Sequence, residues 1–480
     1  MIRSLRLPVL GTVVFFSFFS VAHGQNSPNI VLFISDDMGW NDVSYHGSEI
    51  NTPEIDRLAA EGVRLERFYV QSVCSPTRAS LFTGRTPLDH GVSSPFNPWF
   101  SRGMPVDEKL MPEYLREGGY STHAVGKWHL GPNEPQYHPL IRGFDSFYGS
   151  LHGYLSNHEE RTAFGRIDWQ RDGETVIEDG YNTQLIADEA IRLIENRDEE
   201  TPFFLYVAFH APHSPLQAPE EAIAQYAHID DEIRRVYAAM VSEMDRGIGR
   251  VIDALDAAGI SEETLVMFFT DNGGVPGLGA SNLPFRGGKN SPWEGGLRVP
   301  AVVYWPGVLD RGRVFNNRIT VMDLLPTFMD MADLPLNPPK PLAGYNLWPA
   351  LSEGVPTRTG NAVFSNYVGG SLMHAYFSDE WKLVRGRNDD GEMQDFLFDI
   401  LVDPYEQNDV SADFPDILAR LSAELDAMPK ADPLTRGETT PDFDAPGAPA
   451  SIEPDTRPVI ATPFAESGPI PYPPENYPAE

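Results

Sequence analysis

Three apolar runs of strand length constrain the fold of this chain more than any other feature. They cover residues 29–35, 201–209 and 264–270, and polar residues follow each run directly. An uninterrupted apolar run is typical of a strand buried on both faces, as in a parallel sheet covered by helices. Helical patterns lie between the runs, at 53–61 and 229–258. We therefore predict an α/β fold with a large, mixed, mostly parallel sheet sandwiched by helices.

The segment after residue 350 has a different character. Short alternating runs at 373–378, 381–385 and 396–400 precede a helical pattern at 415–428, which predicts a smaller α+β domain built on an antiparallel sheet. The expected units are a catalytic domain at 25–350, this domain at 351–430, and a proline-rich acidic tail at 431–480. Further expected elements are strands at 63–70, 121–125 and 300–305 and helices at 108–117 and 322–331.

The first 24 residues have the layout of a secretory signal peptide. Arg3 and Arg6 precede an apolar stretch at 9–21, and small residues follow it. The stretch is too short for a stable membrane anchor, so we expect an exported protein, periplasmic or secreted. The formal net charge of −33 speaks against binding nucleic acid.

Acidic residues follow two of the apolar runs. Asp36 and Asp37 come directly after the first run, and Asp271 and Asn272 come after the third. The carboxyl ends of parallel strands are where open α/β sheets bind their ligands. Oxygen donors crowded there suit a hard divalent cation, Ca²⁺ or Mg²⁺. The alternative for a bare Asp-Asp pair is an ordinary acidic loop or helix cap.

Cys74 is the only cysteine of the 480 residues. A helix is expected to begin beside it, with Ser75 as its cap and Pro76 in its first turn, and to end at Gly84. The positive end of the helix would favour an anion there. A lone thiol can also be a small buried core residue.

Candidate cations follow the strands. Lys127 and His129 alternate in a glycine-flanked extended segment after the strand at 121–125, which would place both side chains on one side. His213 lies between prolines after the second apolar run, whereas His210, just before it, could be a hydrogen-bonded core residue. Lys289 lies in a glycine-rich loop.

Taken together, these motifs resemble the formylglycine-dependent (type I) sulfatase family of the alkaline phosphatase superfamily. The likeness extends from about residue 29 to 427 and rests on Cys-x-Pro-x-Arg at 74–78, the two acidic strand ends, and Gly-Lys-Trp-His-Leu-Gly at 126–131. Within the family, the chain looks most similar to the arylsulfatase B (N-acetylgalactosamine-4-sulfatase) type. The resemblance implies an alkaline-phosphatase-like fold and an exo-acting sulfatase for the 4-sulfate of a galactose-type unit in a polysaccharide.

The resemblance also implies roles for individual residues. A formylglycine-generating maturation enzyme would convert Cys74 to formylglycine, the nucleophile. Arg78 and His129 would orient the formylglycine hydrate, with His129 as the base that expels sulfate, and Asp271 would favour the alkoxide. Sulfate would be bound by Lys127, His213 and Lys289, of which His213 or Lys289 would be the acid. One Ca²⁺ would be held by Asp36, Asp37, Cys74, Asp271 and Asn272.

Two other interpretations remain open from the sequence. A formylglycine-dependent phosphodiesterase or phosphonate hydrolase of the same superfamily would share the fold and the metal acids. A non-catalytic sugar-binding homologue would leave Cys74 unmodified. Side chains that could line a sugar pocket, but that could equally be ordinary loop residues, are His46, His152, His158, Glu159 and Trp293.

Overall fold

A computed structural model describes residues 27–428 and 430, apart from 98–101, 159–166, 355–359, 369 and 389. The expected signal peptide at 1–24 and the tail at 431–480 lie outside the described residues. None of the described helices is both long and apolar enough to cross a membrane.

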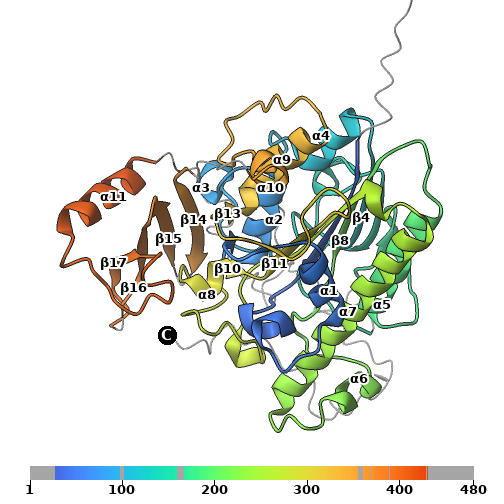
Figure 1. The fold of residues 1–480 in the computed structure, drawn as a ribbon, viewed down its shortest axis with the longest axis horizontal. Coiled ribbons are helices and arrows are strands. Elements are labelled where there is room, and N and C mark those ends of the chain that lie inside the picture. Colours follow the sequence, from blue (N-terminus) through green and yellow to red (C-terminus); the bar gives the residue numbers. More distant parts are fainter. Residues whose placement is uncertain are drawn as a thin grey trace, which may run out of the picture.

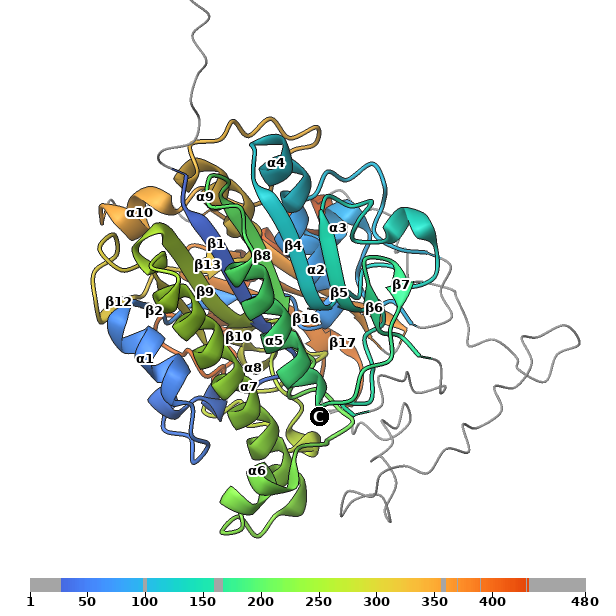
Figure 2. The same ribbon diagram turned by 90° about the vertical axis from the view of Figure 1, so that its right-hand side faces the viewer.

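A ten-stranded sheet forms the centre of the molecule (Figures 1 and 2). β1 (Asn29–Ser35) pairs in parallel with β8 (Phe203–Ala208) on one side and β9 (Thr264–Thr270) on the other. β4 (Ser121–Lys127) continues the parallel pairing beyond β8, and β5 (Ser146–Ser150) beyond β4. The remaining strands are β2 (Val63–Leu65), β6 (Gln170–Arg171), β7 (Glu174–Thr175), β11 (Ala301–Tyr304) and β12 (Arg313–Phe315), in the order β12-β2-β11-β9-β1-β8-β4-β5-β6-β7. Antiparallel pairs join β11 to β2 and β9, and β6 to β5 and β7, so the sheet is mixed but mostly parallel, as predicted.

The central strand separates two hydrophobic cores, because successive side chains of a strand face opposite ways. Ile30, Leu32 and Ile34 contribute to one core, and Val31 and Phe33 to the other. Helices of the first core are α2 (Cys74–Thr83), α4 (Met111–Glu117), α9 (Leu324–Met331) and α10 (Trp348–Ser352). Helices of the second are α1 (Pro53–Glu61), α5 (Asn182–Glu195) and α7 (Glu232–Ala257), on which α6 (Glu220–Gln225) packs. The predicted layers of helices on both faces are therefore confirmed.

A separate four-stranded antiparallel sheet lies at one end of the molecule, covered by α11 (Pro415–Ala427) (Figure 1). Its strands are β14 (Ala362–Val368), β15 (Ser371–Ser378), β16 (Trp381–Arg387) and β17 (Met393–Asp399). A small sheet, β10-β3-β13, consists of β10 (Arg298–Val299), β3 (Phe68–Tyr69) and β13 (Ile319–Thr320). Short helices complete the fold: α3 (Pro87–His90), α8 (Glu294–Leu297), and the 3-10 turns η1 (Trp40–Asp42), η2 (Ser44–His46), η3 (Pro135–Tyr137), η4 (Ser261–Glu263), η5 (Pro276–Leu278) and η6 (Val321–Asp323).

Several element predictions need correction. The single strand expected at 63–70 is two short strands, β2 and β3, in different sheets, because a turn at Glu66 and Arg67 separates them. The helix expected at 108–117 begins only at Met111, with Pro112 in its first turn. Sequence reasoning missed α5, although Ile186, Ala190 and Ile194 are spaced four residues apart and are buried.

Candidate active site

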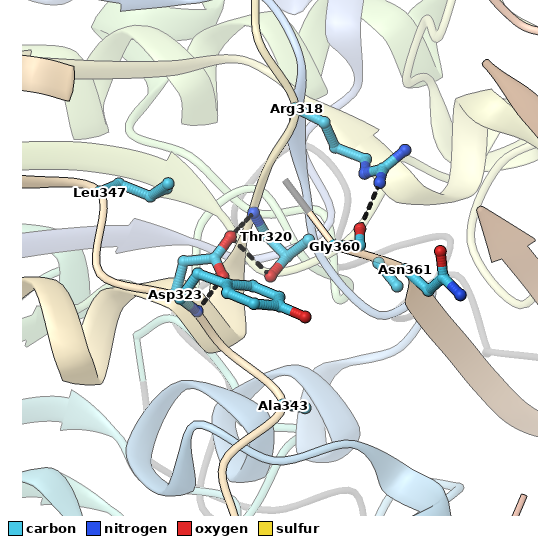
Figure 3. A pocket seen from close by; sticks show the side chains of 9 residues that line it. Arg318, Thr320, Asp323, Ala343, Leu347, Gly360 and Asn361 are labelled. Atoms are coloured by element: carbon cyan, nitrogen blue, oxygen red, sulfur yellow. Dashed lines mark hydrogen bonds between the residues drawn. The ribbon is translucent and has the colours of Figure 1, made fainter. Parts of the chain in front are cut away.

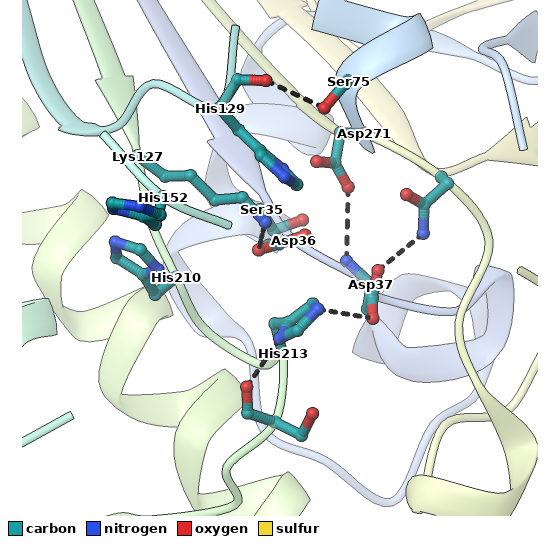
Figure 4. A network of polar contacts seen from close by, with 12 residues as sticks. Ser35, Asp36, Asp37, Ser75, Lys127, His129, His152, His210, His213 and Asp271 are labelled. Carbon is teal, nitrogen blue, oxygen red and sulfur yellow. Dashed lines mark hydrogen bonds and ion pairs between the residues drawn. The ribbon is translucent and has the colours of Figure 1, made fainter. Parts of the chain in front are cut away.

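The polar residues that follow the parallel strands meet at one edge of the central sheet (Figure 4). Asp36 and Asp37 follow β1, Asp271 follows β9, Lys127 ends β4, and His213 lies beyond β8. These four strands are parallel neighbours, so their carboxyl ends lie side by side. The amino end of α2 brings Cys74 to the same edge. The convergence expected from the sequence is present.

Asp36 and Lys127 form a wholly buried ion pair at the centre of this edge. The Lys127 ammonium contacts Oδ2 of Asp36, whereas Oδ1 has no hydrogen-bond partner within the described part of the chain, although it too is buried. A buried carboxylate oxygen without a partner is costly unless something positive binds it. Asp36 therefore offers one oxygen to a ligand of this site.

Three further side chains lie close to the Asp37 carboxylate. Its backbone lies in the left-handed region, with φ of 68°. Its carboxylate accepts hydrogen bonds from Lys289 Nζ at 2.8 Å and from Asn272 Nδ2 at 2.7 Å, and His213 Nε2 lies 3.6 Å away. Burial acts to raise the pKa of Asp37, but the charges of Lys289 and His213 outweigh it and lower the pKa to about 2. The carboxylate is therefore ionised at neutral pH.

Asp271 binds Arg78 rather than a lysine. Both side chains are fully buried, and Arg78 donates from Nη2 at 2.8 Å and from Nε at 3.1 Å to Oδ2 of Asp271. Arg78 Nη1 also donates to the Lys127 carbonyl at 2.7 Å and to the Tyr206 hydroxyl at 3.0 Å. Burial and the nearby Asp36 raise the pKa of Asp271 to about 6, although Arg78 opposes this. Arg78 thus links α2 to β4, β8 and β9.

Cys74 is the first residue of α2 and only 1% of it is exposed. Burial raises the pKa of its thiol to about 11, despite the positive charges of Lys127 and Lys289, so the unmodified thiol is neutral and a weak nucleophile. The predicted cap is wrong: the helix begins at Cys74 after Val73, and Ser75 instead donates from Oγ to the His129 carbonyl at 2.8 Å. Gly84 ends the helix as expected, with φ of 64°.

The donor set fits a divalent cation. Ligand atoms of Asp36, Asp37, Cys74 and His213 all lie within 4.8 Å of one another. Two oxygens at this edge, Asp36 Oδ1 and Asn272 Oδ1, are buried without a hydrogen-bond partner among the described residues. Carboxylate and amide oxygens are the ligands that Ca²⁺ and Mg²⁺ prefer. Three of the residues expected to hold the metal, Asp36, Asp37 and Cys74, are in this group of four, and the fourth member, His213, is one of those expected to bind sulfate. Asp271 is not in the group; Arg78 contacts its Oδ2 only.

Comparison with known proteins adds to this geometry. The family model described as Sulfatase matches residues 28–334. The chain belongs to the sulfatase family.

Relatives of this sulfatase include arylsulfatase J of Mus musculus, 34% identical over 85% of this chain and 76% of its own length. N-acetylgalactosamine-6-sulfatase of Homo sapiens is 35% identical over 72% of this chain and 70% of its own length. The crystal structure of Ps i-CgsB in complex with k-i-k-neocarrahexaose is 33% identical, with a TM-score of 0.79 over 85% of this chain and 94% of that one. These relatives establish a sulfuric ester hydrolase, but not specifically the arylsulfatase B type.

His129 lies at the sulfatase site, but its backbone conformation differs from the prediction. The extended segment predicted for Lys127 and His129 is wrong, because φ of His129 is 59°. The ring still lies near Asp36 and Asp271 (Figure 4). Nε2 lies 3.0 Å from the Phe96 carbonyl, to which it donates, and Nδ1 is buried without a partner in the residues that the structure describes. Gly153 allows this position, because a Cβ there would lie 2.1 Å from the ring.

Most of the residues suggested for a sugar pocket pack into the protein. Trp293 is 7% exposed, and His46 stacks on Trp40 with ring centroids 4.0 Å apart. His152 contacts Asp168 at 2.6 Å, and His158 lies beside Tyr181. Glu159 lies outside the described residues. His210 is a buried residue hydrogen-bonded to Ser150 at 2.8 Å, which matches its interpretation as a core histidine.

Sequence reasoning missed residues that act on the site through contacts between distant segments. The Tyr206 hydroxyl accepts a hydrogen bond from Arg78, but in the sequence it is one of several aromatic residues in an apolar strand. Tyr154 is partly exposed and meets the His213 ring edge-on, with centroids 6.3 Å apart. No local pattern distinguishes either residue.

Proposed function

We propose that this sulfatase removes the 4-sulfate from a terminal galactose-type unit of a sulfated poly- or oligosaccharide. The observation that carries the proposal is the burial of the reacting edge: Cys74 is 1% exposed, Lys127 is 1% exposed and His213 is 8% exposed. A long chain lying along the surface does not reach side chains buried to this extent, whereas a single sulfate group at a chain end does. The formal charge of −33 also repels a polyanion at long range, which favours short-range contacts in a pocket.

The relatives support a carbohydrate substrate. One solved relative is a complex with k-i-k-neocarrahexaose, an oligosaccharide, and several curated relatives are named N-acetylgalactosamine-6-sulfatases. Both favour a sulfated sugar, and the second favours a galactose-type ring. The sequence resemblance indicates the 4-position, and product analysis tests this position separately from the reaction.

The proposed roles follow from the geometry. Cys74, once converted to formylglycine by a maturation enzyme, would supply the nucleophile, and a Ca²⁺ ion would favour its ionised form. Asp36, Asp37, Asp271 and Asn272 would hold the metal. Lys127 and Lys289 would bind the sulfate oxygens, since their ammonium groups already lie at the carboxylates of this edge. His129 would act as a base through Nδ1, because Nε2 is engaged with the Phe96 carbonyl. The expected signal peptide would export the enzyme to the periplasm or beyond.

The test is product analysis with the matured full-length enzyme. Galactose-type oligosaccharides of defined length, each sulfated once at the 4-, 6- or 2-position, are incubated with the enzyme, and the released sulfate and the desulfated product are identified. We expect release from the 4-position of the non-reducing terminal unit, and none with Cys74→Ala. Release from internal units would overturn exo action, and preference for a 6- or 2-sulfate would overturn the position. Faster cleavage of a matched phosphodiester than of every sulfate ester would overturn the proposed reaction.

A further inference from the structure

A buried ionic cluster joins the C-terminal sheet to the segment that carries Lys289. Lys382 of β16 is fully buried, and its ammonium lies 2.8 Å from Glu294 Oε1 and 2.6 Å from Glu406 Oε1. Glu406 also accepts a hydrogen bond from the backbone nitrogen of Glu294 at 2.7 Å, and the Tyr69 hydroxyl donates to Glu294 Oε2 at 2.8 Å. All the charged groups of this cluster are therefore engaged with one another or with the catalytic part of the chain.

Charge burial of this kind is not an efficient source of stability. The desolvation of buried ions is expensive, and well-packed apolar side chains often stabilise a fold as well or better. Burial raises the pKa of Glu406 to about 7 even though Lys382 opposes the shift, which reflects that cost. Charged groups that form directional hydrogen bonds can instead specify a single relative position of the segments that carry them.

The segments fixed here lead directly to the active site. Lys289 is five positions before Glu294, and we call residues 285–293 the Lys289 loop. The loop ends at Trp293, whose ring packs against Phe396 and Phe398 of β17 with centroids 5.3 and 5.9 Å away. The C-terminal sheet therefore holds the loop by an aromatic contact next to the ionic cluster.

A third contact between the C-terminal sheet and the Lys289 loop involves Asn290, the residue after Lys289. Asn366 of β14 donates from Nδ2 to the Asn290 carbonyl at 3.0 Å, while the Asn290 nitrogen donates to the Ser72 carbonyl at 2.9 Å, two residues before Cys74. The Lys289 nitrogen donates to the Gly274 carbonyl at 3.1 Å. With these contacts in place, the Lys289 ammonium lies 2.7 Å from Oδ1 of Asp37. The C-terminal sheet and the catalytic edge thus both contact the Lys289 loop, on two sides of it.

We propose that Lys382, together with Glu406, is a positioning residue that fixes the Lys289 loop through Glu294, so that Lys289 is held where it binds the sulfate group. The inference rests on the proposed function, in which Lys289 contacts the substrate. Lys382 itself is buried in the C-terminal sheet and touches neither the metal ligands nor the nucleophile. Its effect on the reaction passes through the loop.

The experiment compares five full-length, matured variants: Lys382→Met, Glu406→Gln, Lys289→Ala, the double variant Lys382→Met/Lys289→Ala and, as a matched control, Arg385→Met. Arg385 lies three residues after Lys382 on β16 and bridges Asp395 and Asp426, away from the loop. For each variant we measure the melting temperature, kcat/KM for an aryl sulfate, and the inhibition constant of inorganic sulfate. The formylglycine content is determined by mass so that rates refer to matured enzyme.

A positioning role predicts a pattern that lost stability does not produce. Lys382→Met should weaken inhibition by sulfate and lower kcat/KM roughly ten- to hundredfold, as a misplaced binding group does. Glu406→Gln should do the same to a smaller extent. Arg385→Met should lower the melting temperature but leave both other values unchanged. The double variant Lys382→Met/Lys289→Ala should be no slower than Lys289→Ala alone, because the two changes remove the same interaction.

Failure of the proposed role of Lys289 and failure of the positioning proposal give different results. If Lys289→Ala retains full activity and full sulfate inhibition, the proposed role of Lys289 is wrong, and positioning through it falls as well. If Lys289→Ala is impaired but Lys382→Met and Glu406→Gln behave like Arg385→Met, the substrate role of Lys289 stands and the positioning proposal is overturned. Should Lys382→Met fail to fold, Glu406→Gln decides by the same two readouts, because it keeps the shape of the side chain.

Discussion

The guanidinium of Arg78 and the carboxylate of Asp271 form an ion pair in which both side chains are completely buried. Arg78 lies four residues, about one helical turn, after Cys74, and so on the same side of α2. The same guanidinium donates to the Lys127 carbonyl and the Tyr206 hydroxyl. One side chain therefore sets the position of the nucleophile's helix relative to three strands of the sheet.

Removing the Arg78 charge should destabilise the protein strongly. Arg78→Met leaves Asp271 buried and unpaired, which should lower the free energy of unfolding by about 3–5 kcal/mol. Tyr206→Phe removes only one hydrogen bond of the same guanidinium and should cost about 1 kcal/mol. Urea unfolding of both variants at neutral pH measures the difference. Equal losses would contradict a central role for the Arg78–Asp271 pair.

Much of this architecture could be predicted, because its strands are continuous apolar runs. The predicted run at 264–270 coincides with β9, and that at 29–35 with β1. Parallel strands carry the residues that follow them to one edge of the sheet, which is why Asp36 and Asp271 could be expected at the same edge. That β1 and β9 are neighbours in the sheet is seen only in the structure. The weakly patterned strands β6 and β7, two residues each, have no periodicity from which to predict them.

What could not be predicted depends on packing between distant segments. The left-handed conformation of His129 follows from its contacts with Gly153 and the Phe96 carbonyl. Both residues are distant from His129 in the sequence. The contact of Lys382 with Glu294 joins residues 88 positions apart. Periodicity reports the burial of a residue but not its partner, and so these relationships required the structure.

Maturation of Cys74 should be visible by mass. In a host with a formylglycine-generating system, the peptide containing Cys74 should lose one sulfur and two hydrogens and gain one oxygen. Because burial raises the pKa of the unmodified thiol to about 11, protein that retains the thiol should be inactive. Cys74→Ala should fold, with a melting temperature close to that of the parent, and show no turnover. Full activity in a preparation containing only the thiol would contradict the mechanism.

Removal of the divalent cation should lower stability as well as activity. Asp36 and Asp37 are adjacent buried carboxylates, and binding of a cation at a hundred times its Kd stabilises a fold by about 2.7 kcal/mol. Chelation should therefore lower the melting temperature, and added Ca²⁺ should restore it. Asp37→Asn should reduce this Ca²⁺-dependent shift, whereas Asp107→Asn, which changes an exposed carboxylate paired with Lys340, should retain it. A melting curve that chelation leaves unchanged in verified metal-free protein would exclude the site.

Asp323, which lies away from the active site, should make the free energy of unfolding depend on pH. It directly precedes α9, lines a small cavity and accepts hydrogen bonds from the Thr320 nitrogen at 2.6 Å and the Tyr345 nitrogen at 2.7 Å (Figure 3). Burial raises its pKa from 3.8 to about 6, although these hydrogen bonds oppose the shift. Between these two values the folded protein binds a proton that the unfolded chain has released, so stability falls as pH rises, by about 3 kcal/mol in total.

The variant Asp323→Asn isolates this effect, because an amide does not titrate in this range. The free energy of unfolding of the parent minus that of Asp323→Asn should decrease as the pH is raised from about 4 to about 6 and then remain constant. Urea unfolding at several pH values measures the difference. A difference that does not change with pH would show that the Asp323 carboxyl is not perturbed.

The choice of substrate should reveal whether His213 donates a proton to the leaving oxygen. His213 donates from Nδ1 to the Ser214 carbonyl at 2.6 Å, so Nε2 carries a proton only in the imidazolium form, and burial lowers the pKa of the ring to about 3. The negative charge of a bound sulfate ester acts to raise that pKa, and so the acid would form in the substrate complex.

A sugar alcohol is a poor leaving group and needs this proton, whereas an activated phenol does not. His213→Ala should therefore slow sugar sulfates much more than an activated phenyl sulfate, and Lys289→Ala should slow both equally, as loss of a sulfate-binding charge requires. Comparison of kcat/KM for the two substrate types measures this. A sugar-selective loss in Lys289→Ala instead would assign the acid to Lys289, and equal losses in both variants would leave neither residue as the acid.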